Sequence, residues 1–115
     1  MPDEEEILEG QLALDVYQTD RKIIIKSTIA GVKPEDLSIT LHNDMLTIRG
    51  SRQLDDEIAE EDYLYRECYW GNFSRAIILP SDVDQKNIDA SLENGVLTVI
   101  LTKSEGEAVR IKVKD

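Results

Sequence analysis

Apolar and polar residues alternate with a period of two along most of this chain of 115 residues. Such alternation is typical of β-strands that bury one face and expose the other. The segments that we expect to form strands are 12–17, 23–29, 37–42, 45–49, 73–79, 88–93 and 96–102. Between the last two, Asn94-Gly95 supplies the residues that most readily form a type I′ hairpin turn. The pattern predicts an all-β protein, folded as an antiparallel β-sandwich.

Other segments depart from this alternation. Residues 51–62 have no strand pattern and hold six acidic side chains, so we expect a long exposed loop there. Loops of this length in compact domains are usually functional or disordered. A short aromatic strand candidate, 63–68, follows the loop, and Trp70-Gly71-Asn72 separates it from the next strand. The sequence around Pro34 predicts a loop with one helical turn, and 81–87 predicts a polar turn.

The charge balance excludes several classes of partner. The chain carries 24 Asp and Glu residues against 13 Lys and Arg residues, which gives a net charge of −11. Because phosphate backbones and anionic lipids bind through cationic side chains, we expect neither nucleic acid nor membrane as a partner. A lone cysteine, Cys68, fits a reducing compartment. The first ten residues carry acids where a signal peptide carries basic residues, so we predict a cytoplasmic protein.

The residues that could perform catalysis are few. His42 is the only histidine, and it faces outward at the end of a strand, so we interpret it as a solvated side chain. We interpret Cys68 as an inert packing thiol, because no histidine stands near it in the sequence. One histidine and one cysteine cannot complete a zinc site without carboxylates, and the chain has no phosphate-binding glycine motif. We therefore expect no catalytic residue, no metal and no cofactor, and hence not an enzyme.

Three parts of the sequence resemble one family. Ala90-Ser-Leu-Glu-Asn-Gly-Val-Leu-Thr-Val99 is similar to the A-x-L-x-N-G-V-L-T-V signature of the α-crystallin domain, the core of small heat-shock proteins. Phe73-Ser-Arg-Ala-Ile-Ile-Leu-Pro80 resembles the F-x-R-x-x-x-L-P strand of that family. The segments 29–37 and 46–50 match its first half. The resemblance covers residues 11–103, and the three matches stand in the family's order and spacing.

The resemblance implies an immunoglobulin-like sandwich that acts as a chaperone in the stress response. Family members are ATP-independent holdases that bind partly unfolded client proteins and suppress their aggregation. They form homodimers, which assemble into larger oligomers. On this basis the chain divides into a short acidic arm (1–11), an α-crystallin-type sandwich (12–103) and a tail with an [IV]-x-[IV] motif (104–115). Because the family's arm is usually long and apolar, this short arm predicts weak activity.

For the dimer, the resemblance to the non-animal branch implies a strand exchange. The long loop would carry one strand to the partner subunit, where it pairs with the first strand of the sandwich. The exchanged residues would be Tyr63, Leu64, Tyr65 and Arg66. The accepting strand would include Leu12, Leu14 and Val16. The alternative is that the segment folds back onto its own sandwich.

Two further contacts between subunits follow from the resemblance. Arg75, which has the same strand parity as Phe73, would form an ion pair across the interface; the alternative is an edge arginine in water. In an extended tail, Ile111 and Val113 point the same way and could enter one groove. The apolar residues of that groove would be Ile39, Leu41, Ala90 and Leu92. The alternative for the tail is an end without function.

Two other functions remain open at this stage. The first is a co-chaperone-like adaptor sandwich that docks one specific folded partner, although such an adaptor would lack the tail motif and the strand after the acidic loop. The second is an enzyme of unrecognised type, which the scarcity of histidine, cysteine and glycine motifs argues against.

Overall fold

The computed structural model describes residues 10–104 and 111–115. Its strands are β1 (Gly10–Gln11), β2 (Asp15–Gln18), β3 (Lys22–Thr28), β4 (Leu37–His42), β5 (Met45–Arg52), β6 (Gly71–Ile78), β7 (Val83–Glu93) and β8 (Val96–Lys103). Two 3₁₀ turns accompany them, η1 (Pro34–Asp36) and η2 (Glu60–Asp62). Of the predicted terminal segments, residues 1–9 and 105–110 lie outside the described residues.

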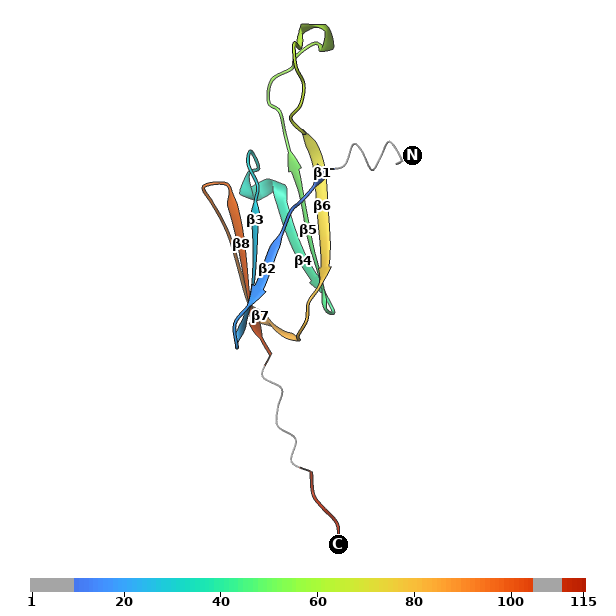
Figure 1. The fold of residues 1–115 in the computed structure, drawn as a ribbon, viewed down its shortest axis with the longest axis vertical. Coiled ribbons are helices and arrows are strands. Elements are labelled where there is room, and N and C mark those ends of the chain that lie inside the picture. Colours follow the sequence, from blue (N-terminus) through green and yellow to red (C-terminus); the bar gives the residue numbers. More distant parts are fainter. Residues whose placement is uncertain (1–9, 105–110) are drawn as a thin grey trace.

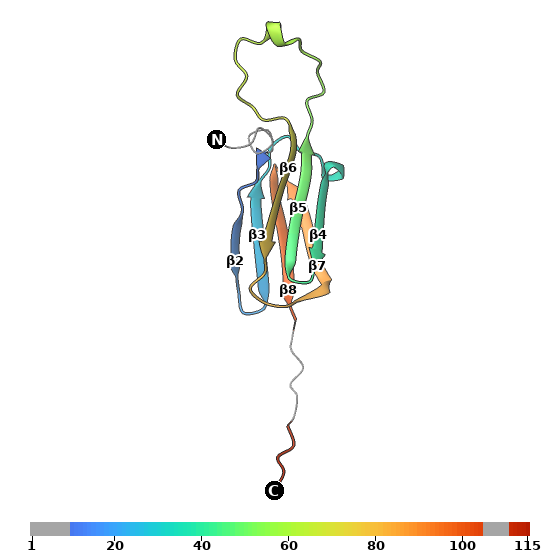
Figure 2. The same ribbon diagram turned by 90° about the vertical axis from the view of Figure 1, so that its right-hand side faces the viewer.

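Two four-stranded sheets lie face to face, as Figures 1 and 2 show, and they confirm the predicted sandwich. One sheet has the strand order β1-β6-β5-β4, and the other has the order β2-β3-β8-β7. The pairings are antiparallel, with the exception of the short parallel contact between β1 and β6. None of the helical turns in the described part of the chain has the length or apolarity to cross a membrane.

The core lies between the two sheets and follows the alternation in the sequence. Ile23 and Ile25 of β3, Ile48 of β5, and Val99 and Leu101 of β8 are at most 1% exposed. Each side chain of this kind gains roughly 1.5–3 kcal/mol by leaving water. Most residues between them are more exposed, although Ile24, between Ile23 and Ile25, is also buried, with 9% exposed. The period-two pattern therefore identified the core strands correctly.

The predicted turns are also found, with one difference in strand length. Asn94 and Gly95 have φ angles of 52° and 76°, as a type I′ turn between β7 and β8 requires. The helical turn predicted around Pro34 is η1. However, part of the predicted polar turn 81–87 belongs to β7: Val83 pairs with Lys103, pairing resumes at Ile88, and residues 84–87 form an irregularity between them.

Two predicted strands differ from the structure. The first predicted strand, 12–17, is shorter than expected: residues 12–14 cross between the sheets, and β2 begins at Asp15. The short strand β1, which precedes the predicted segment, runs along the edge of β6. The segment 63–68 forms no strand in the single chain but belongs to a long loop, 53–70, that projects beyond the end of the sandwich (Figure 2). A strand forms only beside another strand to which its main chain can hydrogen-bond, and no strand of the described residues pairs with this segment.

Candidate interaction site

An apolar groove lies where the edges of the two sheets meet, between β4 and β7. Its volume is about 210 Å³. The side chains that line it are mostly aliphatic: Pro34, Leu37, Ile39, Ala90, Ser91, Leu92 and Leu97. Pockets for drug-sized ligands usually measure about 300–1,000 Å³, so this groove has the size for a few side chains of a peptide.

The structure brings together most of the residues predicted for this groove. Ile39, Ala90 and Leu92 line it, whereas Leu41 packs against the core outside the lining. Sequence reasoning missed Leu37 and Leu97, although both face the same side as their predicted neighbours. Leu37 shares the parity of Ile39, and Leu97 lies opposite Leu92 in the ladder. The strand parity would therefore have identified both Leu37 and Leu97 as groove residues.

A larger hollow lies at the end of the sandwich that is opposite the long loop. It measures about 900 Å³, and its lining is mainly polar and charged, including Asp20, Asp82 and Lys103. Lys103 donates a hydrogen bond from its Nζ to the carbonyl oxygen of Thr19 at 2.9 Å. Because the side chains that line this hollow are mainly polar and charged, the β4–β7 groove, with its mostly aliphatic lining, is the better candidate for binding apolar side chains of another polypeptide.

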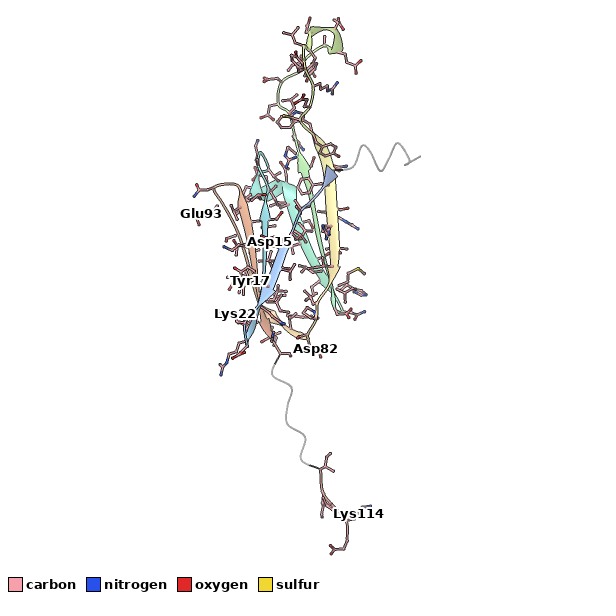
Figure 3. All side chains as sticks on the ribbon, viewed as in Figure 1. Asp15, Tyr17, Lys22, Asp82, Glu93 and Lys114 are labelled. Atoms are coloured by element: carbon pink, nitrogen blue, oxygen red, sulfur yellow. The ribbon has the colours of Figure 1, made fainter. Side chains whose placement is uncertain are left out.

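The outer edge of β2 carries no paired strand within the described residues, because β2 is the end strand of its sheet. All four of its residues are exposed, and Figure 3 shows Asp15 and Tyr17 along it. Val16 lies opposite Ile25 and is 45% exposed. The main-chain groups of such an edge can pair with another extended segment.

Of the predicted accepting residues, only Val16 belongs to this edge. Leu12 is buried and Leu14 is half-buried, and both lie in the crossing segment before β2. The Oγ of Ser27 donates a hydrogen bond to the carbonyl oxygen of Ala13 at 2.8 Å. The prediction that Leu12 and Leu14 form part of the strand was wrong, because the chain changes sheets there.

The predicted exchange segment lies in the projecting loop. Leu64 and Tyr65 are 93% and 86% exposed, so two adjacent large side chains lie almost fully in water. Arg66 lies over the ring of Tyr63, with 4.8 Å between the guanidinium carbon and the ring centroid. Its Nη1 also lies 3.6 Å from a carboxylate oxygen of Glu60. The segment makes these contacts within the loop and is not paired with its own β2.

Arg75 lies on β6, opposite the buried Ile48, and therefore on the face toward the other sheet. Its Nη1 donates a hydrogen bond to the carbonyl oxygen of Leu12 at 3.0 Å. The side chain is nevertheless exposed in the single chain, because β6 lies near the sheet edge. Within residues 10–104 and 111–115, no carboxylate forms an ion pair with it.

The remaining sequence candidates lie outside these surfaces. Ile111 and Val113 of the tail are 82% and 87% exposed. His42 is exposed, as its strand parity predicted. Cys68 is exposed too, so the interpretation as a packing thiol was wrong: it lies in the returning limb of the loop, away from the core. In the part of the chain that the structure describes, no three His, Cys, Asp or Glu side chains gather as metal ligands would.

Comparison with known proteins agrees with this architecture. The model of the Hsp20/alpha crystallin family matches residues 15–114. Small heat shock protein C2 of Rickettsia felis is 34% identical over 101 residues, which cover 87% of this chain and 66% of that protein. The 17.6 kDa class I heat shock protein 1 of Arabidopsis thaliana is 32% identical, and the match covers 88% of this chain and 66% of that protein. The structure of heat shock protein 16.0 from Schizosaccharomyces pombe superposes with a TM-score of 0.79 at 31% identity, and the match covers 92% of this chain and 77% of that one.

The chain therefore belongs to the Hsp20/alpha crystallin family, as its motifs indicated. Its two sheets form an α-crystallin domain, and its relatives come from bacteria, fungi and plants. The chain spans 60% to 66% of the length of three of the curated relatives it matches.

Proposed function

We propose that this chain is an ATP-independent holdase that binds partly unfolded proteins and suppresses their aggregation. Members of the family generally act as chaperones without ATP. The observation that carries the proposal is the aliphatic groove between β4 and β7, which lies open to water. Aliphatic side chains of an unfolded client would leave water on entering it, and main-chain pairing at a sheet edge requires no particular client sequence.

The second part of the proposal is a homodimer formed by reciprocal strand exchange. The segment 63–66 of each subunit would pair with the β2 edge of the other. Two features support it: the segment projects beyond its own sandwich with Leu64 and Tyr65 exposed, and the outer edge of β2 is open. A reciprocal exchange is isologous and covers both edges at once.

A third part concerns Arg75. We assign its guanidinium to an ion pair with a carboxylate of the partner subunit. Its position near the edge of β6, on the side where β2 and the crossing segment lie, would place it close to the exchanged strand. Covering a guanidinium at an interface without a counter-charge costs several kcal/mol, so the contact would need an acidic partner.

Assembly beyond the dimer would use the tail. Ile111 and Val113 would enter the β4–β7 groove of a neighbouring dimer, with Lys112 facing water. Burial of two aliphatic side chains is worth roughly 1.5–3 kcal/mol each before the cost of ordering the tail, so one tail binds weakly. Several tails acting together would be needed, which makes assembly sensitive to concentration.

We also propose a cytoplasmic location and no nucleic-acid or membrane partner. The exposed thiol of Cys68 supports a reducing compartment, and the net charge of −11 disfavours polyanions.

Light scattering of several unrelated heat-aggregating clients, without nucleotide, tests the holdase proposal. Ala90→Gln places a polar side chain in the groove and should weaken suppression. Ser38→Gln, on the outward face of β4, is the matched control and should act like the parent. Suppression that requires ATP, or equal suppression by both variants, would contradict the proposal. Suppression restricted to one client would favour the adaptor that docks a single folded partner.

A further inference from the structure

The loop 53–70 leaves and rejoins the sandwich at one point. Arg52 is the last residue of β5, and it lies opposite Gly71, the first residue of β6. Every residue of the loop, including the proposed exchange segment, is therefore attached through this pair. We call residues 52 and 69–72 the loop neck.

The side chain of Arg52 joins three parts of the molecule at the neck. Its Nε donates a hydrogen bond to the carbonyl oxygen of Ala30 at 2.6 Å, in the turn after β3 of the opposite sheet. Its Nη1 donates to the carbonyl oxygen of Tyr69, on the returning limb of the loop, at 3.3 Å. Its guanidinium carbon lies 5.8 Å from the centroid of the Phe73 ring, within the range of a cation–π contact.

One glycine makes room for this arrangement. Gly50 precedes Arg52 on the same face of β5, and a Cβ there would collide with the ring of Phe73. Gly31 has a φ of 76°, a conformation that favours glycine, and the Cδ of Arg52 lies at an ordinary contact distance of 3.6 Å from the position that a Cβ would take. The ring of Phe73 and the side chain of Arg52 therefore lie close against the main chain at Gly50 and Gly31.

The returning limb is held a second time. The hydroxyl of Tyr69 donates a hydrogen bond to the carbonyl oxygen of Asn72, so the ring folds back over the start of β6. The limb is thus fixed on both sides: its carbonyl oxygen by Arg52 and its side chain by Asn72. The contacts that Arg66 of the exchange segment makes with Glu60 and Tyr63 lie farther out along the loop.

From these contacts we infer that Arg52 is a positioning residue for dimerisation, which sets the direction in which the exchange loop leaves the sandwich. The inference rests on the strand exchange proposed above. A loop with a fixed exit direction has less conformational freedom to lose when it reaches the partner's β2 edge, so the dimer is stabilised without any contact of Arg52 with the partner.

The geometry requires arginine rather than any cation. A guanidinium is planar, and its nitrogens donate in fixed, diverging directions, so Nε and Nη1 can serve two carbonyl oxygens while the plane faces an aromatic ring. A lysine ammonium is a single point at the end of a flexible chain, and it cannot hold both limbs in the same way. Arg52→Lys therefore keeps the positive charge and removes the paired hydrogen bonds to the carbonyl oxygens of Ala30 and Tyr69.

The test compares Arg52→Lys and Arg52→Ala with the parent. Arg49→Ala is the control, because Arg49 is an exposed arginine on the outward face of the same strand. Sedimentation at several concentrations gives the dimer dissociation constant, and hydrogen exchange reports protection of β2 and of 63–66. We expect a dissociation constant raised roughly tenfold or more by both Arg52 variants and unchanged by Arg49→Ala.

A variant without residues 54–66 separates a positioning role from a purely structural one. With no strand to exchange, it should be a monomer, and the change that Arg52→Lys makes to its melting temperature measures what the neck contacts add to the stability of the sandwich alone. If the deletion variant is a monomer and the full-length Arg52→Lys dimerises like the parent, the positioning role is wrong and the exchange stands. If the deletion variant still dimerises, the exchange is wrong, and the inference with it. Unfolding of both full-length Arg52 variants would also overturn it.

Discussion

The guanidinium of Arg75 donates a hydrogen bond of 3.0 Å to the carbonyl oxygen of Leu12. Arg75 belongs to β6 of one sheet, and Leu12 lies where the chain passes to the other sheet. The adjacent carbonyl oxygen, that of Ala13, accepts a hydrogen bond from Ser27 of that second sheet. The crossing segment is therefore held by one side chain from each sheet, directly before the open edge strand β2 begins.

Replacement of Arg75 by alanine should weaken both the crossing segment and the dimer. The hydrogen bond to Leu12 lies in a partly exposed place, so its loss should cost the sandwich about 1 kcal/mol. A lost intersubunit ion pair would raise the dimer dissociation constant in addition. Thermal unfolding and sedimentation measure the two effects. An unchanged melting temperature together with an unchanged dissociation constant would favour the alternative, an edge arginine in water.

Replacement of Ser27 by alanine should lower the stability of the sandwich by about 1–2 kcal/mol. Ser27 is 3% exposed, and without its hydroxyl the partly buried hydrogen bond to the carbonyl oxygen of Ala13 is lost. Denaturant unfolding measures the change. Ser38→Ala removes a hydroxyl from the exposed face of β4 and should leave stability within about 0.5 kcal/mol of the parent. Equal effects of the two substitutions would contradict this role of Ser27.

Deletion of Leu54–Arg66 should convert the dimer to a monomer without unfolding the sandwich. The deleted residues belong to neither sheet, and none of them is buried. Light scattering gives the mass, and circular dichroism reports the sheets. A deletion variant that keeps its β spectrum and still has the mass of a dimer would show that the subunits associate by another surface.

Replacement of Ile111 and Val113 by glycine should abolish assembly beyond the dimer. Both side chains are exposed in the single chain, so their loss should not alter the stability of the sandwich. Sedimentation of parent and variant at several concentrations measures assembly. Lys112→Gly is the control, because its side chain would face water in the proposed contact. If parent and variant remain dimers throughout, the tail does not assemble this protein.

The sequence predicted those parts of the fold whose partners lie in the same chain. Leu97, Val99 and Leu101 are buried, and the residues between them are half-buried, because both neighbours of β8 belong to its own sheet and one face covers the core. The short strand β1 was missed, because Gly10 and Gln11 are too few to show a period. The length of β7 was underestimated because residues 84–87, which form an irregularity between two paired parts of the strand, are polar and show no strand pattern.

The candidate site was predicted less completely, for a related physical reason. Three of the four residues predicted for the groove line it, but Leu41 was included although the lining does not extend to it. The contacts of Arg52 could not be predicted, because Ala30 and Tyr69 are distant in sequence and only the fold brings their carbonyl oxygens together. The segment 63–66 carries a strand signal but forms no strand in the single chain, which is what the proposed exchange with another chain would produce.

The open edge of β2 has a thermodynamic consequence for the protein as a whole. If that edge is completed by a second subunit, part of the free energy of unfolding is a free energy of association and depends on mass action. A tenfold rise in protein concentration would then add about 1.4 kcal/mol per dimer to the free energy that separates folded dimer from unfolded chains. The melting temperature should rise with concentration, so the amount of protein in the cell would itself help to determine how much heat the fold survives.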